Sequence, residues 1–412
     1  MRDSLLYIAL FLLLLAEMLP IIPGFVTLLS TVLLVIYLIS KGIHVDKSYL
    51  NWMLLVFGFF SLSMLWALNW KVSAYKLVYS VLPIFVATTA VYGFLKRSPG
   101  NLKKLLWLYM IAFAFLLVYM LLNLGDIRAL AAEGERIGGT INENAGIAED
   151  DASHFNSNGI ALHLCYSLFV GYILFFKGKK TVVVRVAALA VATLTVFLIL
   201  MTGSRKAFLL LLLPFVVFPL LKRKKGNTIL LLPIALAVVF GGYYAIMHVP
   251  FMYEMMGSRI EEMFDIMSGT TSGGEDISRL MLIEYGIEWF KEKPIFGYGI
   301  NNFRVLSDGT WMFAGRNFYA HNNYLELLVG VGVVGFLIYY SCYVHFWRKL
   351  RKNVAGNSLN SWVVVMIIVS LFLDFTIVSY YDLVRNLILC ICFYAAEYIN
   401  KSEITNKRII NT

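Results

Sequence analysis

His321 is the residue of this sequence whose type and position best suit proton transfer. It stands where a long polar segment, residues 249–320, gives way to an apolar helix predicted over 321–346. A neutral imidazole can accept a proton from a hydroxyl group near neutral pH, which is the task of a general base. A histidine at such a boundary is more often a capping or packing residue. The catalytic interpretation of His321 therefore depends on which groups lie near it.

Three arginines close to apolar stretches are candidates for binding an anion. Arg205 lies in the tight turn Thr202-Gly203-Ser204-Arg205, Arg279 begins a predicted helix, and Arg136 lies in an acidic segment. A guanidinium group is always charged and presents a planar set of donors that fits phosphate oxygens. The alternative for each arginine is an interfacial anchor that reaches toward water. Two or three of them beside a membrane would suit a lipid pyrophosphate.

The composition predicts that transmembrane helices position these residues. The chain has 412 residues, 60% of them hydrophobic and 15% charged, with a mean hydropathy of +0.75. Runs of about 20 apolar residues are long enough to cross the hydrocarbon core of a bilayer as helices. We expect an all-α, polytopic membrane protein with about twelve transmembrane helices. The predicted spans are residues 4–19, 23–40, 50–67, 74–95, 103–122, 156–176, 181–201, 205–222, 228–247, 321–346, 360–380 and 383–399.

The distribution of basic residues predicts how the chain crosses the membrane. With the N-terminus in the cytoplasm, the clusters of Lys and Arg fall in connections that face the cytoplasm, as the positive-inside rule requires. Both termini are then cytoplasmic, and His321 and the three arginines lie on the outer face. The net charge of +10 reflects this topology, so no nucleic acid partner is expected.

The predicted spans divide the chain into four parts. Residues 1–247 hold the first nine spans with an outer loop near 125–155, and 248–320 form an extracytoplasmic loop. Residues 321–399 hold the last three spans, and 400–412 form a cytoplasmic tail.

The extracytoplasmic loop is predicted to contain two amphipathic helices, one around 260–267 and one over 278–291. The apolar stripe of the second helix consists of Leu280, Ile283, Ile287 and Phe290. Asp276 or Ser278 would cap this helix, and Lys293-Pro294 would end it. Two such helices on the outer membrane surface would roof a cavity.

Other patterns in the chain indicate neither cofactor nor metal chemistry. Gly330-Val331-Gly332-Val333-Val334-Gly335 has the spacing of a dinucleotide-binding fingerprint, but it lies inside a predicted transmembrane helix. We interpret it as a surface for close helix packing. The four cysteines lie in apolar runs without ligand spacing, and the acidic residues of the loop have the spacing of a solvated helix face. We expect no metal and no cofactor.

Several of these residues recur in an order that characterises one family. Thr202-Gly203-Ser204-Arg205 is followed by Arg279, by Pro294-Ile295-Phe296-Gly297-Tyr298-Gly299, by His321-Asn322-Asn323-Tyr324-Leu325, and by Gly332 with Gly335. This series resembles the O-antigen ligase and O-antigen polymerase superfamily of bacterial envelope glycosyltransferases. Arg136 and the segment 156–161 resemble an earlier loop pattern of the same superfamily.

The resemblance implies a GT-C-like glycosyltransferase of the bacterial cytoplasmic membrane that needs neither a metal nor a nucleotide sugar. Such an enzyme moves a glycan from undecaprenyl pyrophosphate to an acceptor hydroxyl on the outer face, among membrane lipids and alongside envelope polysaccharide assembly proteins. By their positions in the motifs, Arg205 and Arg279 would bind the pyrophosphate, with Arg136 as a third candidate. His321 would activate the acceptor, which is a glycan in a polymerase and lipid A–core in a ligase.

We favour a polysaccharide polymerase of the O-antigen or capsule type, because polymerases occur in Gram-positive and Gram-negative envelopes whereas ligation requires an outer-membrane lipid. An O-antigen ligase is the alternative. A more distant alternative is a lipid-linked oligosaccharide flippase, which would place polar residues or broken helices near the bilayer midplane. A non-catalytic scaffold would tolerate replacement of His321 and of the arginines.

Overall fold

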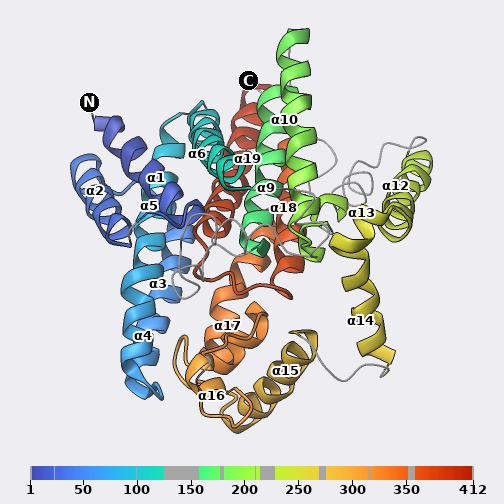
Figure 1. Cartoon of the computed structure of the whole chain (residues 1–412). Coiled ribbons are helices and arrows are strands. Elements are labelled where there is room, and N and C mark those ends of the chain that lie inside the picture. Colours follow the sequence, from blue (N-terminus) through green and yellow to red (C-terminus); the bar gives the residue numbers. More distant parts are fainter. Residues whose placement is uncertain are drawn as a thin grey trace. The chain divides into compact units, whose positions relative to one another are not determined.

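The computed structural model consists of helices joined by turns in every part of the chain that it describes (Figure 1). It describes residues 2–22, 24–98, 100–124, 157–176, 181–208, 210–213, 228–268, 275–313, 315, 317–350 and 358–410. Six of the described helices are long and apolar enough to cross a membrane: Lys47–Trp66, Trp70–Arg97, Asn101–Asn123, Ser157–Phe175, Val182–Met201 and Asn323–Leu350. Two shorter helices, Phe25–Lys41 and Val363–Leu373, are also apolar. The prediction of an all-α membrane protein is confirmed, and the count of about twelve spans stays a prediction.

The chain packs into two compact units, and each unit draws on separate stretches of the sequence. The first unit comprises Met1–Leu33, Ser98–Leu220 and Lys224–Thr271. Within it α6 packs against α1 and α9, and α9 packs against α10. Its helices are α1 (Arg2–Met18), α6 (Asn101–Asn123), α9 (Ser157–Gly171), α10 (Val182–Met201), α12 (Thr228–His248), α13 (Pro250–Met252) and α14 (Ser258–Ser268).

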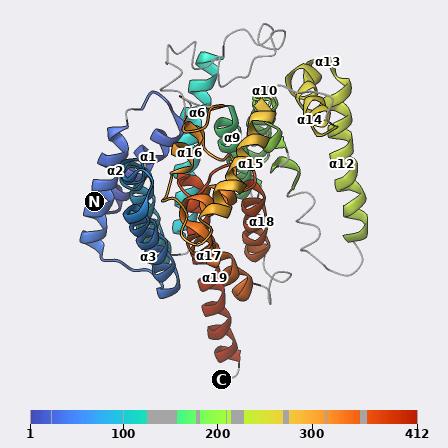
Figure 2. The same cartoon turned by 90° about the horizontal axis from the view of Figure 1, so that it is seen from below.

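The second unit comprises Leu34–Arg97, Leu221–Arg223 and Ser272–Thr412, and α2 (Phe25–Lys41) crosses the boundary between the two. Its other helices are α3 (Lys47–Leu62), α4 (Trp70–Lys76), α5 (Leu82–Arg97), α15 (Glu275–Glu292), α16 (Phe303–Asp308), α17 (Asn323–Leu350), α18 (Ser358–Leu373) and α19 (Leu383–Ile410). Within this unit α17 packs against α3, α15 and α19. Figures 1 and 2 both show α15 and α16 beside the first turns of α17.

Both helices predicted in the extracytoplasmic loop are present as α14 and α15. As predicted, α15 ends at Glu292, immediately before Lys293-Pro294. The predicted cap is wrong, because α15 begins at Glu275 and therefore includes Asp276 and Ser278. The roof that the two helices were expected to form stays a prediction.

The buried face of α15 differs from the predicted stripe. Leu282 and Trp289 are buried, whereas Leu280 and Ile287 are exposed. The reason is the fit at Gly286, where an added Cβ would lie 2.6 Å from the Leu325 side chain. Leu325 occupies the space beside this glycine, so the helix turns that face toward α17.

A break inside α17 explains part of the glycine-rich motif. Gly332 has φ 64° and ψ −173°, which is not helical, and an added Cβ would lie 2.2 Å from the carbonyl oxygen of Ile295. At the break, the backbone N–H of Val333 donates to the carbonyl of Pro294 at 2.8 Å. The N–H of Tyr298 donates to the carbonyl of Val329 at 2.9 Å. The turn after α15 is thus hydrogen-bonded into the interruption of the transmembrane helix.

The interpretation of this motif as a helix-packing surface therefore needs a correction. It holds for Gly335, whose Cα region approaches Phe59 of α3 so closely that a Cβ would lie 2.8 Å from that ring. It is wrong for Gly332, which approaches the backbone of a turn and not another helix. A backbone that approaches a second backbone this closely leaves no room for a Cβ atom, so only glycine fits.

We expect Gly332→Ala to destabilise the protein by on the order of 3 kcal/mol or more, because alanine there would be both overpacked and strained. The detergent-purified protein would be heated to a series of temperatures, and size-exclusion chromatography would measure the fraction that stays folded. The midpoint temperature of Gly332→Ala should be lower than that of the wild type. Gly58→Ala is the matched control, because Gly58 lies in α3 with no other atom within 4 Å of an added Cβ. Equal midpoints for the two variants would contradict the described backbone contact.

The span predicted over 360–380 ends earlier, at Leu373 of α18. Asp374 follows with its side chain fully buried beside the equally buried Arg385 of α19. A buried carboxylate needs hydrogen-bond donors, and the turn 374–382 supplies them by leaving the helical conformation. The last predicted span also differs in length, because α19 continues beyond the predicted boundary at 399, to Ile410.

Candidate functional site

An apolar core attaches the polar loop to the start of α17. It consists of Leu282, Trp289, Tyr298, Phe303, Phe313, Ala320, Leu325 and Val329. The rings of Trp289 in α15 and Phe303 in α16 meet edge to face, with centroids 5.2 Å apart. These residues come from α15, α16 and α17 and from the two connections between these helices. Their burial therefore holds the polar residues of these segments near one another.

His321 lies in the turn that immediately precedes α17. Its backbone has φ 51°, in the left-handed region, which is uncommon for residues other than glycine, although asparagine, aspartate and histidine adopt it more often than the rest. The centroid of its ring lies 4.0 Å from that of Tyr319. The next residue, Asn322, caps the helix by accepting a hydrogen bond from the backbone N–H of Leu325 at 3.1 Å. His321 therefore stands partly exposed on a turn whose course is fixed on both sides.

Two guanidinium groups act on the same tyrosine, one of them by direct contact. The Arg304 guanidinium lies over the Tyr319 ring, 5.0 Å from its centroid, and it donates to the carbonyl of Asn317 at 3.5 Å. Burial raises the pKa of the Tyr319 phenol, and the positive charges of Arg304 and Arg279 oppose that rise. His321 and Arg304 thus contact Tyr319, and the charge of Arg279 acts on it electrostatically. This arrangement sets a proton acceptor beside cations that suit an anionic ligand.

A lysine inside a transmembrane helix contributes to the same region. Lys76 is the last residue of α4, only 7% exposed, and its Nζ atom lies 3.4 Å from the centre of the Tyr381 ring. Burial lowers the pKa of Arg304, but Tyr381 and the Glu326 carboxylate outweigh that effect and raise it overall. Tyr381 therefore interacts with both Lys76 and Arg304, and Glu326 adds a negative charge that acts on Arg304.

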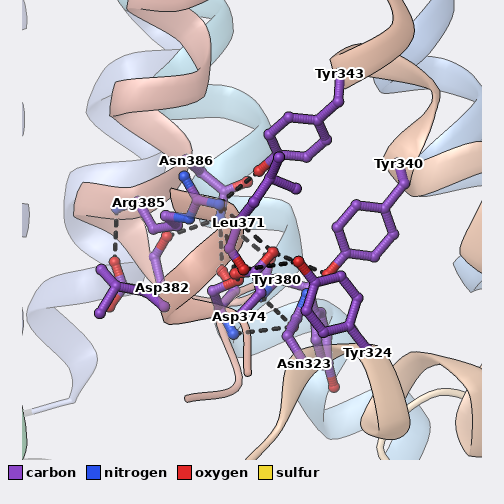
Figure 3. A network of polar contacts seen from close by, with 12 residues as sticks. Asn323, Tyr324, Tyr340, Tyr343, Leu371, Asp374, Tyr380, Asp382, Arg385 and Asn386 are labelled. Carbon is purple, nitrogen blue, oxygen red and sulfur yellow. Dashed lines mark hydrogen bonds and ion pairs between the residues drawn. The ribbon is translucent and has the colours of Figure 1, made fainter. Parts of the chain in front are cut away.

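A buried polar network fixes the first residue of α17 (Figure 3). Asn323 donates its backbone N–H to the carbonyl of Asp374 at 2.7 Å, and its side-chain oxygen accepts from the N–H groups of Ser379 and Tyr380. Its side-chain nitrogen donates to the Tyr340 hydroxyl, which donates in turn to Asp374 at 2.8 Å. The network connects the turn that carries Tyr381 to the turn that carries His321.

Arg205 lies in the first compact unit, at the start of the helical residues 205–208. The preceding Ser204 is buried, and its hydroxyl donates to the side-chain oxygen of Asn158 at 2.9 Å and accepts from the N–H of Ala207. The two sequence motifs around Asn158 and Arg205 are thus in direct contact. Arg205 itself is half-exposed on this fixed turn.

The remaining predicted ligand, Arg136, lies outside the described residues, as do the outer loop 125–155 and His154. Among the described residues, no group of three or more His, Cys, Asp and Glu side chains is placed to hold a metal ion.

The sequence reasoning missed Lys76, Arg304, Tyr319, Tyr381 and Glu326. A signal was available for two of them, because Lys76 and Glu326 are charged residues within apolar spans, and such residues are candidates for function by that position alone. Nothing in the local sequence singled out Arg304, which lies beyond the motif 294–299. Its relevance depends on where α16 lies.

These features define a multi-pass helical membrane protein that gathers histidine, arginine and lysine side chains at the start of a transmembrane helix. Residues 189–340 match the family model described as O-antigen ligase. The matched segment contains Arg205, Arg279 and His321, and it also contains Arg304 and Glu326. The match confirms the resemblance of this chain to the O-antigen ligase and polymerase superfamily of membrane enzymes. No curated protein matches the chain.

Proposed function

We propose that the protein is a glycosyltransferase that moves a glycan from undecaprenyl pyrophosphate to an acceptor hydroxyl on the outer face of the bacterial cytoplasmic membrane. The observation that carries this proposal is that His321 and Arg304 both contact Tyr319, on which the charge of Arg279 also acts. A histidine in a region with two guanidinium groups combines a proton acceptor with donors for phosphate oxygens.

In the proposed reaction, the acceptor hydroxyl oxygen attacks the anomeric carbon of the donor glycan. The bond between that carbon and the pyrophosphate oxygen breaks, and His321 receives the proton of the hydroxyl group. Arg279 stabilises the negative charge that develops on the departing pyrophosphate, and Arg205 and Arg136 are proposed to share this task. Pyrophosphate is a good leaving group, so positioning and charge stabilisation suffice without a metal ion.

We favour a polymerase of the O-antigen or capsule type over a ligase, for the reason of envelope type given above. Both reactions use the same donor chemistry and require the same base, and they differ in the acceptor. The matched family carries the description O-antigen ligase, so ligation to lipid A–core is the second candidate. Other envelope polysaccharide assembly proteins are the expected partners of either enzyme.

The break in α17 bears on the flippase alternative, because transporters place broken helices at their substrate sites. In this chain the backbone groups of Val329 and Val333 at the break bond to Tyr298 and Pro294. They are therefore engaged within the protein and do not face a translocated ligand. This observation favours a structural role for the break and supports the enzyme.

The glycan profile of a deletion strain tests the proposed function. We expect single repeat units on the lipid carrier or on its acceptor, because a strain without the polymerase still makes and exports the unit. Long chains that accumulate on the carrier would indicate the ligase instead. Lipid-linked units confined to the cytoplasmic face would indicate a flippase and would overturn the proposal. Complementation with the intact gene is the control.

A further inference from the structure

Glu326 is a carboxylate in an unfavourable place for a charge. It lies in the first turns of α17 and is only 1% exposed. A buried carboxylate is costly unless hydrogen bonds and opposite charges compensate for the loss of water. Its presence in an apolar helix therefore requires compensating interactions.

One oxygen of Glu326 holds the residue before His321. The backbone N–H of Ala320 donates to Oε2 of Glu326 at 2.9 Å, and this bond is buried. In an ordinary capping box the acidic residue bonds to the N–H of the capping residue itself. Here the cap is Asn322, and Glu326 reaches two residues further back. The two side-chain bonds therefore bracket His321.

This bracket coincides with the strained backbone of His321. A left-handed conformation costs roughly 1–2 kcal/mol for a residue such as histidine and persists only where its surroundings impose it. The Ala320 bond on one side and the Asn322 cap on the other are such constraints. Together they set the direction in which the imidazole leaves the turn.

The charge of Glu326 also matters, because positive groups surround it. Among the described residues, the positive groups that act on Tyr319 or Tyr381 are Arg279 from α15, Arg304 from α16 and Lys76 from α4, and Glu326 is the negative one. Arg304 and Lys76 both act electrostatically on Glu326, and Oε1 of Glu326 has no hydrogen-bond partner among the described residues. Tyr319, Tyr380 and Tyr381 are the other titratable groups of this region.

We propose that Glu326 is a positioning residue for His321, which fixes the turn through Ala320 and offsets the positive charge of Lys76, Arg279 and Arg304. This inference rests on the proposed function, in which His321 is the base. Three cations nearby disfavour a protonated imidazole and make it a weaker base, and the carboxylate counteracts that effect. Glu326 thus allows phosphate-binding cations and an effective base to occupy the same site.

Two variants separate the two parts of this role. Glu326→Gln keeps an oxygen that can accept from Ala320 but removes the charge, whereas Glu326→Asp keeps the charge but shortens the side chain. The purified full-length variants would be assayed with lipid-linked glycan extracted from the deletion strain. The rate of glycan transfer would be measured as a function of pH.

For Glu326→Gln we expect the acidic limb of the profile to move to lower pH by roughly half to one unit, and kcat to fall about threefold to tenfold. The shift has this sign because loss of a negative charge makes the imidazole easier to deprotonate. For Glu326→Asp we expect the limb to stay in place and kcat to fall about tenfold or more, because His321 is misplaced. The KM for the donor should change little in both.

An unmoved acidic limb in Glu326→Gln, or an effect confined to KM, would overturn the inference. If Glu326→Gln does not fold, a wild-type kcat in Glu326→Asp would overturn it equally. The variant His321→Asn separates a failure of the proposed function from a failure of the role of Glu326. If that variant transfers glycan normally, the proposed function fails. If it is inactive while Glu326→Gln behaves as the wild type, only the role of Glu326 is refuted.

Discussion

Replacement of His321 by asparagine should lower the rate of glycan transfer by about 10²–10⁴-fold, the contribution expected of a general base. Asparagine is the informative substitute because it tolerates the left-handed backbone that residue 321 adopts, with φ 51°. It can still form hydrogen bonds but cannot accept the proton of an attacking hydroxyl group at neutral pH. The effect should fall on kcat, measured with lipid-linked donor and purified enzyme, and in cells as loss of the mature polysaccharide.

His248→Ala is the matched control for this prediction. His248 is the last residue of α12, is exposed, and has its Nδ1 atom 2.9 Å from the carbonyl oxygen of Tyr244. It belongs to the first compact unit and has no role in the proposed reaction, so we expect wild-type transfer. Normal transfer by His321→Asn, with both variants folded and inserted, would refute His321 as the base and would favour a non-catalytic scaffold.

Replacement of Arg279 by alanine should lower kcat/KM by about 10²–10³-fold, because one stabilising donor for the developing charge of the pyrophosphate is lost. Arg279→Lys should retain part of the activity, since a lysine keeps the charge but not the paired donors of the guanidinium group. The stability of the protein should change little, because the side chain is half-exposed. Initial rates over a range of donor concentrations would measure the effect.

Lys291→Ala is the control on the same helix, because Lys291 is exposed in the last turn of α15, far from Arg279 at its beginning. A loss of activity in Arg279→Ala that also occurs in Lys291→Ala would indicate a general effect on α15 rather than phosphate binding. Unchanged activity in Arg279→Ala would remove this residue from the proposed site. The contribution of Arg205 would then need a separate test.

The local sequence predicted most of the described helices with their approximate bounds, but not the short helices α13 and α16. The helix over 278–291 is present and ends before Lys293-Pro294, because proline disfavours continuation of a helix. Its start was placed three residues too late, since Asp276 and Ser278 are compatible both with a cap and with a helical turn. The end of α18 at Leu373 was also missed, because the charge of Asp374 is compensated by Arg385 on the next helix.

The sequence also predicted part of the site, namely the residues that stand at the ends of predicted segments. His321 and Arg279 stood out because each lies at an end of a predicted segment, and the order of the motifs resembles one family. Arg304 and Lys76 carry no such local mark. Their approach to Tyr319 and Tyr381 results from the packing of α16 and α4 within the second unit.

The sequence by itself determined that the chain is helical and crosses a membrane, because hydrophobicity and helical period are properties of neighbouring residues. It also determined which glycines and which histidine belong to a family pattern. Only the tertiary structure decided that Gly332 interrupts α17 to pair with the turn 294–299, and that Glu326 reaches back across His321. These arrangements depend on backbone and side-chain contacts between segments that are distant in sequence, and such contacts have no periodic signature in the sequence itself.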